Sequence, residues 1–252
     1  MNQTPIAMES PLPILYLDHA IVAVHKPSGL LVHRSPIDRH ETVFALQQVR
    51  DQLGRWVYPV YRLDKPTSGV LLFALERDMA RALSEQFAEH RVGKHYLAVV
   101  RGYCPESGEI DHALRDKADP LIDRHRSRPA ATQSALTRYQ RLATVEIPVE
   151  VDRYPQSRYS LVDLFPRTGR KHQLRRHMKH IGHPIIGDAK HGKGVHNRYF
   201  QQAYACHRLL LACYALEVEH PETGLSLRIE APLEGSFLRV LETFGWEGCI
   251  PV

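Results

Sequence analysis

Hydrophobic and polar residues alternate in short runs along most of the chain, and Gly/Pro turns separate these runs. This pattern is typical of β-strands joined by tight turns. Residues 14–33 predict two short strands on either side of a turn at 26–29. Further strands are expected at 56–64, 70–75, 94–101, 132–145 and 158–165, and a hairpin at 210–231 that turns at 221–224.

Four segments carry apolar residues at helical spacing instead. They predict helices at 42–53, 77–90, 171–181 and 234–244; Gly54 would end the first of them. Strands dominate and the helices interrupt them irregularly, so we predict an α+β fold with a mixed, mostly antiparallel central sheet and flanking helices.

No internal repeat or linker divides the 252 residues. We therefore expect a flexible N-terminal arm at 1–13 and one catalytic domain at 14–252, with 105–130 as a polar excursion. Nothing at the N-terminus has the build of a signal peptide, and no apolar run approaches membrane-spanning length. These features predict a cytoplasmic protein without membrane contact.

Charge changes this picture only modestly, because a net charge of +5 and a pI near 9.0 are compatible with many partners. Its placement is more informative: residues 167–179 contain six basic residues and no acid. That segment favours a polyanionic partner. The four cysteines include no CxxC pair, and the histidines near residue 180 have no thiolate or carboxylate in the same predicted helix. We therefore predict no metal site and no cofactor.

The segment YRLDKPTSG, residues 61–69, places an arginine two residues before an aspartate. On a strand, Arg62 and Asp64 would lie on the same face, with Leu63 turned toward the core. A carboxylate at a strand end can act as a nucleophile if a cation keeps it ionised. The residues alone also permit a plain turn with a surface ion pair, and they do not say which arginine is the partner.

Three stretches in fixed order carry a family resemblance: RLDKPTSG at 62–69, KHYLAVVRG at 94–102, and TGRKHQLRRH at 168–177 followed by GHPIIGD at 182–188. With KPSGLLVH at 26–33, they resemble the signature motifs of the RluA-type pseudouridine synthases. The likeness extends over about 14–244. It implies the pseudouridine synthase fold and the isomerisation of uridine to pseudouridine on RNA, without metal or cosubstrate.

The resemblance assigns roles residue by residue. Asp64 matches the catalytic nucleophile, Tyr96 the tyrosine that stacks on the uracil, and Arg175 the arginine paired with the carboxylate. Arg62 matches an arginine that holds the RNA open, and Leu174 would pack against the base. One departure is plain, because the family usually has histidine where this chain has Tyr61. RNA binding is further assigned to the polar residues of the same block, namely Arg170, Lys171, His172 and Gln173.

The features around 32–35, 158–164 and 187–198 are most similar to a branch of the family that acts on uridine 65 of tRNA. No additional S4 RNA-binding module is expected, because the resemblance begins near residue 14. We expect a tRNA substrate, no obligate protein partner and a monomer. The alternatives are an rRNA-modifying sibling, a non-catalytic RNA-binding protein or chaperone with the same fold, and, more remotely, a metal-dependent hydrolase.

Overall fold

The computed structural model describes residues 11–34, 40–115, 131–233 and 235–251. Most of the predicted N-terminal arm and residues 116–130 of the 105–130 excursion lie outside these residues. Within the described part, Leu12 is already buried, and the carbonyl of Pro13 accepts a hydrogen bond from the N–H of His25 at 2.8 Å.

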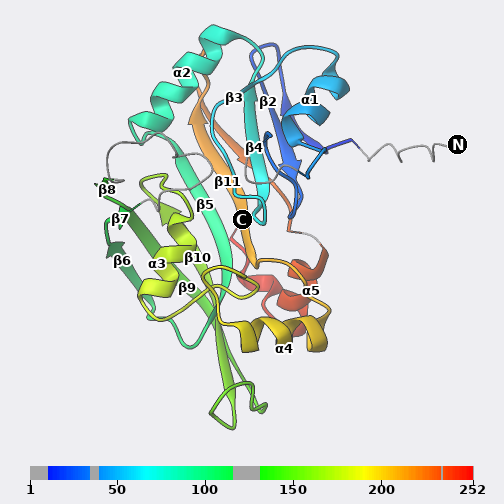
Figure 1. Ribbon diagram of the computed structural model, residues 1–252. Coiled ribbons are helices and arrows are strands. Elements are labelled where there is room, and N and C mark those ends of the chain that lie inside the picture. Colours follow the sequence, from blue (N-terminus) through cyan, green and yellow to red (C-terminus); the bar gives the residue numbers. More distant parts are fainter. Residues whose placement is uncertain (1–10, 35–39, 116–130, 234, 252) are drawn as a thin grey trace, which may run out of the picture.

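A twisted ten-stranded sheet runs through the molecule (Figure 1). Its main path is β1-β2-β4-β11-β5-β10-β9-β6; β12 pairs with β11 and β3 with β4. The bounds are β1 Ile14–Leu17, β2 Ile21–Lys26, β3 Tyr58–Pro59, β4 Ser68–Ala74, β5 Gly93–Arg101, β6 Ser107–Asp111, β9 Leu136–Ile147, β10 Ser157–Pro166, β11 Leu211–Glu219 and β12 Ser226–Glu230. The short strands β7 Leu114–Arg115 and β8 Thr132–Gln133 form a separate pair.

All of the pairings in the large sheet are antiparallel except one, the parallel contact between β4 and β11. The predicted α+β class with a mixed, mostly antiparallel sheet is therefore confirmed. In that parallel contact, Gly69 has φ +117°, and a Cβ there would lie 1.9 Å from the carbonyl oxygen of Cys213. Only glycine lets the two backbones approach this closely.

Helices cover both faces of the sheet (Figure 1). Their bounds are α1 Ala45–Leu53, α2 Arg77–Ala88, α3 Gln173–His180, α4 Gly194–Tyr204 and α5 Gly235–Thr243, and a 3₁₀ turn follows at Glu247–Cys249. Leu83 of α2 and Met178 of α3 pack on one face. Phe200 of α4 and Phe237 of α5 pack on the other face, and α1 covers its own part of the sheet through Val49.

Strand β5 shows how the alternating pattern builds both halves of this core. Tyr96, Ala98 and Val100 point toward the α3 side, while Leu97 and Val99 point toward α4 and α5. The predicted common face of Tyr96, Ala98 and Val100 is therefore confirmed. It places the Tyr96 ring on the same side of the sheet as α3.

The prediction of a strand at 56–64 was wrong for most of its length, because only Tyr58 and Pro59 pair with β4. Pro59 has no N–H to continue the ladder, and the chain then leaves the sheet. Asp64 consequently lies in a loop. The turn was also misplaced: the N–H of Thr67 donates to the carbonyl of Asp64 at 3.0 Å, whereas Ser68 and Gly69 already belong to β4.

Two further differences concern the segments around the site. Both N-terminal strands precede the turn at 26–29 and are joined at 18–20, whereas the prediction put that turn between them. Helix α4 was not predicted. Its buried side chains are only His196 and Phe200, and it starts at a glycine without a capping side chain, so its sequence lacks both the usual helix start and a clear apolar stripe.

Candidate active site

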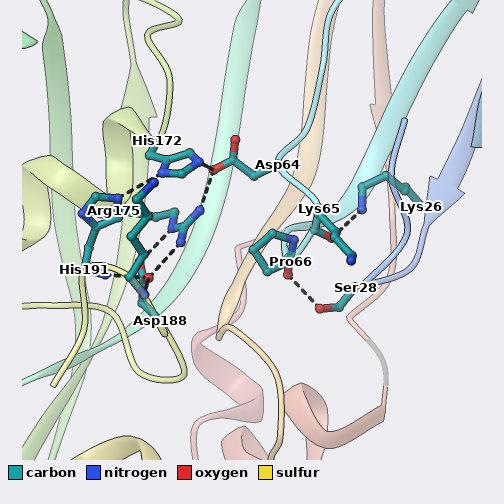
Figure 2. Close-up of polar contacts among 10 residues, drawn as sticks. Lys26, Ser28, Asp64, Lys65, Pro66, His172, Arg175, Asp188 and His191 are labelled. Atoms are coloured by element: carbon teal, nitrogen blue, oxygen red, sulfur yellow. Dashed lines mark hydrogen bonds and ion pairs between the residues drawn. The ribbon is translucent and has the colours of Figure 1, made fainter. Parts of the chain in front are cut away.

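The Asp64 loop lies opposite the beginning of α3 (Figure 2). The side chain of Asp64 is 29% exposed, and its Oδ2 accepts a hydrogen bond from Nη1 of Arg175 at 3.0 Å. These two residues are 111 positions apart in the chain. The ion pair expected from the family resemblance is therefore present, and the neighbouring Arg62 does not provide it.

Arg175 is held in turn by Asp188 (Figure 2). Its Nε and Nη2 donate to the two carboxylate oxygens of Asp188 at 2.7 and 2.8 Å. This bidentate geometry fixes the plane of the guanidinium and leaves Nη1 directed at Asp64. The side chain of Arg175 is only 6% exposed and that of Asp188 is fully buried, so both charges require these partners.

Asp188 is the residue that the sequence reasoning missed. Burial opposes its ionisation, but hydrogen bonds from Arg175 and from the backbone N–H groups of His191 and Lys190 outweigh burial and lower the pKa of Asp188. Those two backbone hydrogen bonds are both 2.9 Å long. The quoted GHPIIGD motif contained Asp188, and an acid closing an apolar run was the available signal.

His172 completes the polar group beside Asp64. It has φ +55° at the start of α3, and its Nε2 lies 3.9 Å from Oδ2 of Asp64. Its Nδ1 is 3.0 Å from Nε2 of His191. Burial lowers the pKa of His172 to about 4, against the opposing charge of Asp64, so the imidazole is neutral at pH 7.

A second missed group fixes the other side of the Asp64 loop. Lys26 is fully buried, and its Nζ donates to the carbonyls of Pro27, Leu30 and Lys65 at 2.9, 2.8 and 3.1 Å. Ser28 Oγ donates to the carbonyl of Pro66 at 2.7 Å, as Figure 2 shows. The turn at 26–29 thus clamps the residues that follow Asp64. Burial lowers the pKa of Lys26 to about 7.

Tyr96 is 8% exposed and packs in the core cluster that also contains Leu174. Burial, together with its hydrogen-bonded neighbour Cys213 and the charge of Asp64, raises the pKa of Tyr96 well above 10. The residue therefore presents a neutral phenol at pH 7. Tyr96 and Leu174 lie on the side of the sheet where a base could enter beside Asp64.

Tyr61, at the family's usual histidine position, has an internal role. Its hydroxyl donates to the carbonyl of Val70, and its ring stacks on Phe87 with centroids 4.8 Å apart. Both contacts tie the loop to β4 and α2. Tyr61 therefore supports the loop through its packing and its hydrogen bond. An aromatic ring with a hydroxyl can provide both contacts, so this role needs no imidazole.

The predicted RNA-binding residues fall into two groups. Arg62 and Lys171 are exposed, and within the described part of the chain no hydrogen bond or ion pair involves their side chains. Arg170 donates to the carbonyl of Ser134 at 3.1 Å. Gln173 is buried: its Oε1 accepts from Thr168 and Arg170, and its Nε2 donates to Leu136 and Thr137. An RNA contact by Gln173 stays a prediction that this geometry does not favour.

Both ring nitrogens of His177 on α3 have partners within the protein. His177 is 3.0 Å from Thr137 Oγ1 through Nδ1 and 3.0 Å from the carbonyl of His112 through Nε2. Across the described residues, no group of three or more potential ligands could hold a metal ion. In the same residues, no helix is long and apolar enough to cross a membrane.

A buried arginine, held by the buried Asp188, thus donates a hydrogen bond to a carboxylate that is 29% exposed. The family model described as RNA pseudouridylate synthase matches residues 20–180. The chain therefore belongs to the RNA pseudouridylate synthase family.

Individual relatives agree with this assignment. The chain is 51% identical over 240 residues to the tRNA pseudouridine synthase C of Pectobacterium carotovorum subsp. carotovorum, covering 95% of this chain and 64% of that protein. It is 51% identical over 235 residues to the protein of that name from Haemophilus ducreyi, covering 93% and 96%. The protein of that name from Yersinia pestis is also 51% identical, over 240 residues, with 95% and 93% covered.

Two solved structures resemble the fold. Human RNA Pseudouridylate Synthase Domain Containing 4 superposes with a TM-score of 0.68 at 26% identity, covering 91% of this chain and 92% of that one. Human RNA Pseudouridylate Synthase Domain Containing 1 gives the same TM-score at 25% identity, covering 98% and 90%.

Proposed function

We propose that this protein is a tRNA pseudouridine synthase that isomerises uridine 65, with Asp64 as the nucleophile. The observation that carries the proposal is the Asp64–Arg175–Asp188 chain of ion pairs, which holds one carboxylate ready at the edge of the core. The names of the relatives support tRNA as the RNA, and the resemblance to the branch that modifies uridine 65 supports the position.

In this proposal the target uridine leaves its helix and its base enters beside Tyr96 and Leu174. Leaving the stack costs a few kcal/mol, which a partly apolar pocket with a stacking ring offsets. The N1–C1′ bond then breaks, the uracil turns, and a C5–C1′ bond forms. The C5 proton is lost and N1 gains one, so the reaction is a redox-neutral isomerisation.

Each polar residue has a role that follows from its surroundings. Arg175 pairs with Asp64 and orients its carboxylate. Arg62 and Lys171 are exposed, and they contribute positive charge that attracts the RNA backbone. We further propose that 14–252 acts as one catalytic domain, as a monomer in the cytoplasm, where its tRNA substrate would be found.

The proposal is tested with tRNA and rRNA tritiated at uridine C5 and incubated with the protein and EDTA. Tritium release from tRNA, mapped to pseudouridine at position 65, is the expected result. Asp64→Asn should lower the rate by more than about 10⁴-fold, because it removes the nucleophile, while tRNA affinity stays within a fewfold. Release from rRNA alone would favour the rRNA-modifying alternative; full activity of Asp64→Asn would refute the assigned mechanism.

A further inference from the structure

A cavity lies away from Asp64, at the C-terminal end of β5. It has a volume of about 550 Å³, within the range of ligand-binding pockets. The loop that joins β9 to β10 and the beginning of α4 flank it (Figure 1). The residues of its wall used below are Arg101, Tyr103, Asp152, Tyr154 and His196.

The wall contains a buried polar atom without a partner. His196 is 4% exposed, and its Nδ1 lies 2.9 Å from the hydroxyl of Tyr159. Its Nε2 is buried and has no hydrogen-bond partner in the described structure. Burial and the charge of Arg101 lower the pKa of His196 to about 4, so the imidazole that borders the cavity is neutral at pH 7. Leaving such an atom unpaired costs about 1–3 kcal/mol, which a ligand's hydrogen bond would recover.

The rim adds positive charge and aromatic faces. The guanidinium of Arg101 makes no hydrogen bond or ion pair with the described residues, whereas Asp152 is neutralised by its ion pair with Lys193. Tyr103 and Tyr154 are 44% and 56% exposed. The guanidinium of Arg158 lies 5.1 Å from the centroid of the Tyr103 ring, and that of Arg153 lies 5.3 Å from the centroid of the Tyr154 ring. Exposed rings beside arginines are the usual elements of a site for an unstacked nucleotide, which offers a base to a ring and a phosphate to a cation.

The cavity lies at the end of β5, and Arg101 continues the face of Leu97 and Val99, opposite to the face of Tyr96. One RNA that reaches both sites would therefore pass around this end of the strand. Arg101 is five residues beyond Tyr96 on β5, which corresponds to about 17 Å along the strand. That length matches about five stacked nucleotides at about 3.4 Å each. The backbone also connects the two sites, since the N–H of Arg101 donates to the carbonyl of Pro184, four residues before Asp188.

We propose that this cavity is a second nucleotide subsite, which binds an unstacked nucleotide of the same RNA outside the reacting uridine. The base would hydrogen-bond to Nε2 of His196 and lie against Tyr154, and the phosphate would contact Arg101. This inference rests on the proposed function. A free mononucleotide has the same chemistry, and the experiment distinguishes these two sources.

Affinity for an unmodified tRNA transcript is measured as a function of salt in the Asp64→Asn background, so that no turnover occurs. Arg101→Ala should raise Kd about tenfold and reduce the slope of log K against log salt by about 0.9, the loss of one phosphate contact. Tyr154→Ala should raise Kd by about tenfold, through lost stacking, with an unchanged slope. The control Arg239→Ala removes an exposed positive charge of α5 that does not line the cavity, and its Kd should stay within about twofold of the background.

Equal effects of Arg239→Ala and Arg101→Ala would overturn the subsite. So would the absence of an effect of either Arg101→Ala or Tyr154→Ala. Uridine and adenosine monophosphates are titrated separately. If one of them binds, Arg101→Ala abolishes that binding, and tRNA affinity is equal in all variants, the cavity serves a free nucleotide and the RNA subsite is wrong. Failure of the proposed function would appear separately, as no pseudouridine formed by the unsubstituted protein.

Discussion

Asp64 is held between two independent supports, and each acts on a different part of the residue. Arg175 contacts its carboxylate, while Lys26 and Ser28 bind the carbonyls of the two residues that follow it. The backbone position and the side-chain direction are therefore fixed separately. Such double support is what a preorganised nucleophile requires, since a small displacement costs much of the rate.

Asp188→Asn tests the support behind Arg175. The change removes a buried negative charge and leaves Arg175 with Asp64 as its charged partner, so we expect a loss of about 3 kcal/mol in unfolding free energy and a fall in kcat. Urea denaturation and single-turnover kinetics measure the two effects. The control Glu109→Gln breaks the exposed pair with Arg138 and should cost less than about 1 kcal/mol. Unchanged stability and turnover in Asp188→Asn would contradict the assignment.

At the scale of elements, the site depends on where β4 and α3 begin. The Asp64 turn leads directly into β4, and the parallel contact of β4 with β11 requires Gly69 at its start. Helix α3 begins immediately after His172, whose positive φ turns the chain so that Arg175 faces Asp64. The backbone conformations of Gly69 and His172 thus help to bring Asp64 and Arg175 together, although these two residues are 111 positions apart.

Gly69→Ala should be among the most damaging glycine substitutions in the chain. Its Cβ would meet the Cys213 carbonyl at 1.9 Å at a φ of +117°, so we expect a loss of about 3 kcal/mol or more, or insoluble protein. Gly224→Ala is the matched control: it also has positive φ, +71°, but no atom lies within 4 Å of its Cβ. It should cost only about 1 kcal/mol. Thermal and urea unfolding compare the two, and equal losses would show that the close approach is unimportant.

At the scale of the whole molecule, histidines are buried on both sides of the sheet. Burial lowers the pKa of His172 near α3 and of His196 on α4 to about 4. The pKa values of His177 and His191 are lowered as well, again mainly by burial. All four residues are therefore better accommodated neutral than charged in the folded protein.

This burial predicts a loss of stability in mild acid. Below about pH 6.5 the unfolded chain binds protons on these histidines before the folded protein does, so unfolding free energy should fall as pH drops from 6.5 toward 4. Urea denaturation at several pH values measures the slope of unfolding free energy against pH. His172→Gln removes one of the titrating groups and should make the slope shallower over that interval. An identical slope in this variant would show that His172 contributes nothing to it.

The sequence by itself determined the family, the α+β class, most strands and helices, and the identities of Asp64, Tyr96 and Arg175 as the residues to look for. Periodicity and ordered motifs are local properties, so they can be read without coordinates. The same locality explains two errors. Tertiary packing decided that the chain leaves the sheet after Pro59, and it also decided that α4 forms despite its weak apolar stripe.

Only the tertiary structure decided which residues support the site by contacting one another. Asp188 behind Arg175, Lys26 beneath the Asp64 loop, Tyr61 on Phe87, and the cavity beside His196 all join segments distant in sequence. Hydrogen bonds and burial depend on which atoms meet in space, and sequence spacing does not encode that. The arginine two residues from Asp64 is exposed, while the one 111 residues away is its partner, because the fold brings α3 to the loop and aims Arg62 outward.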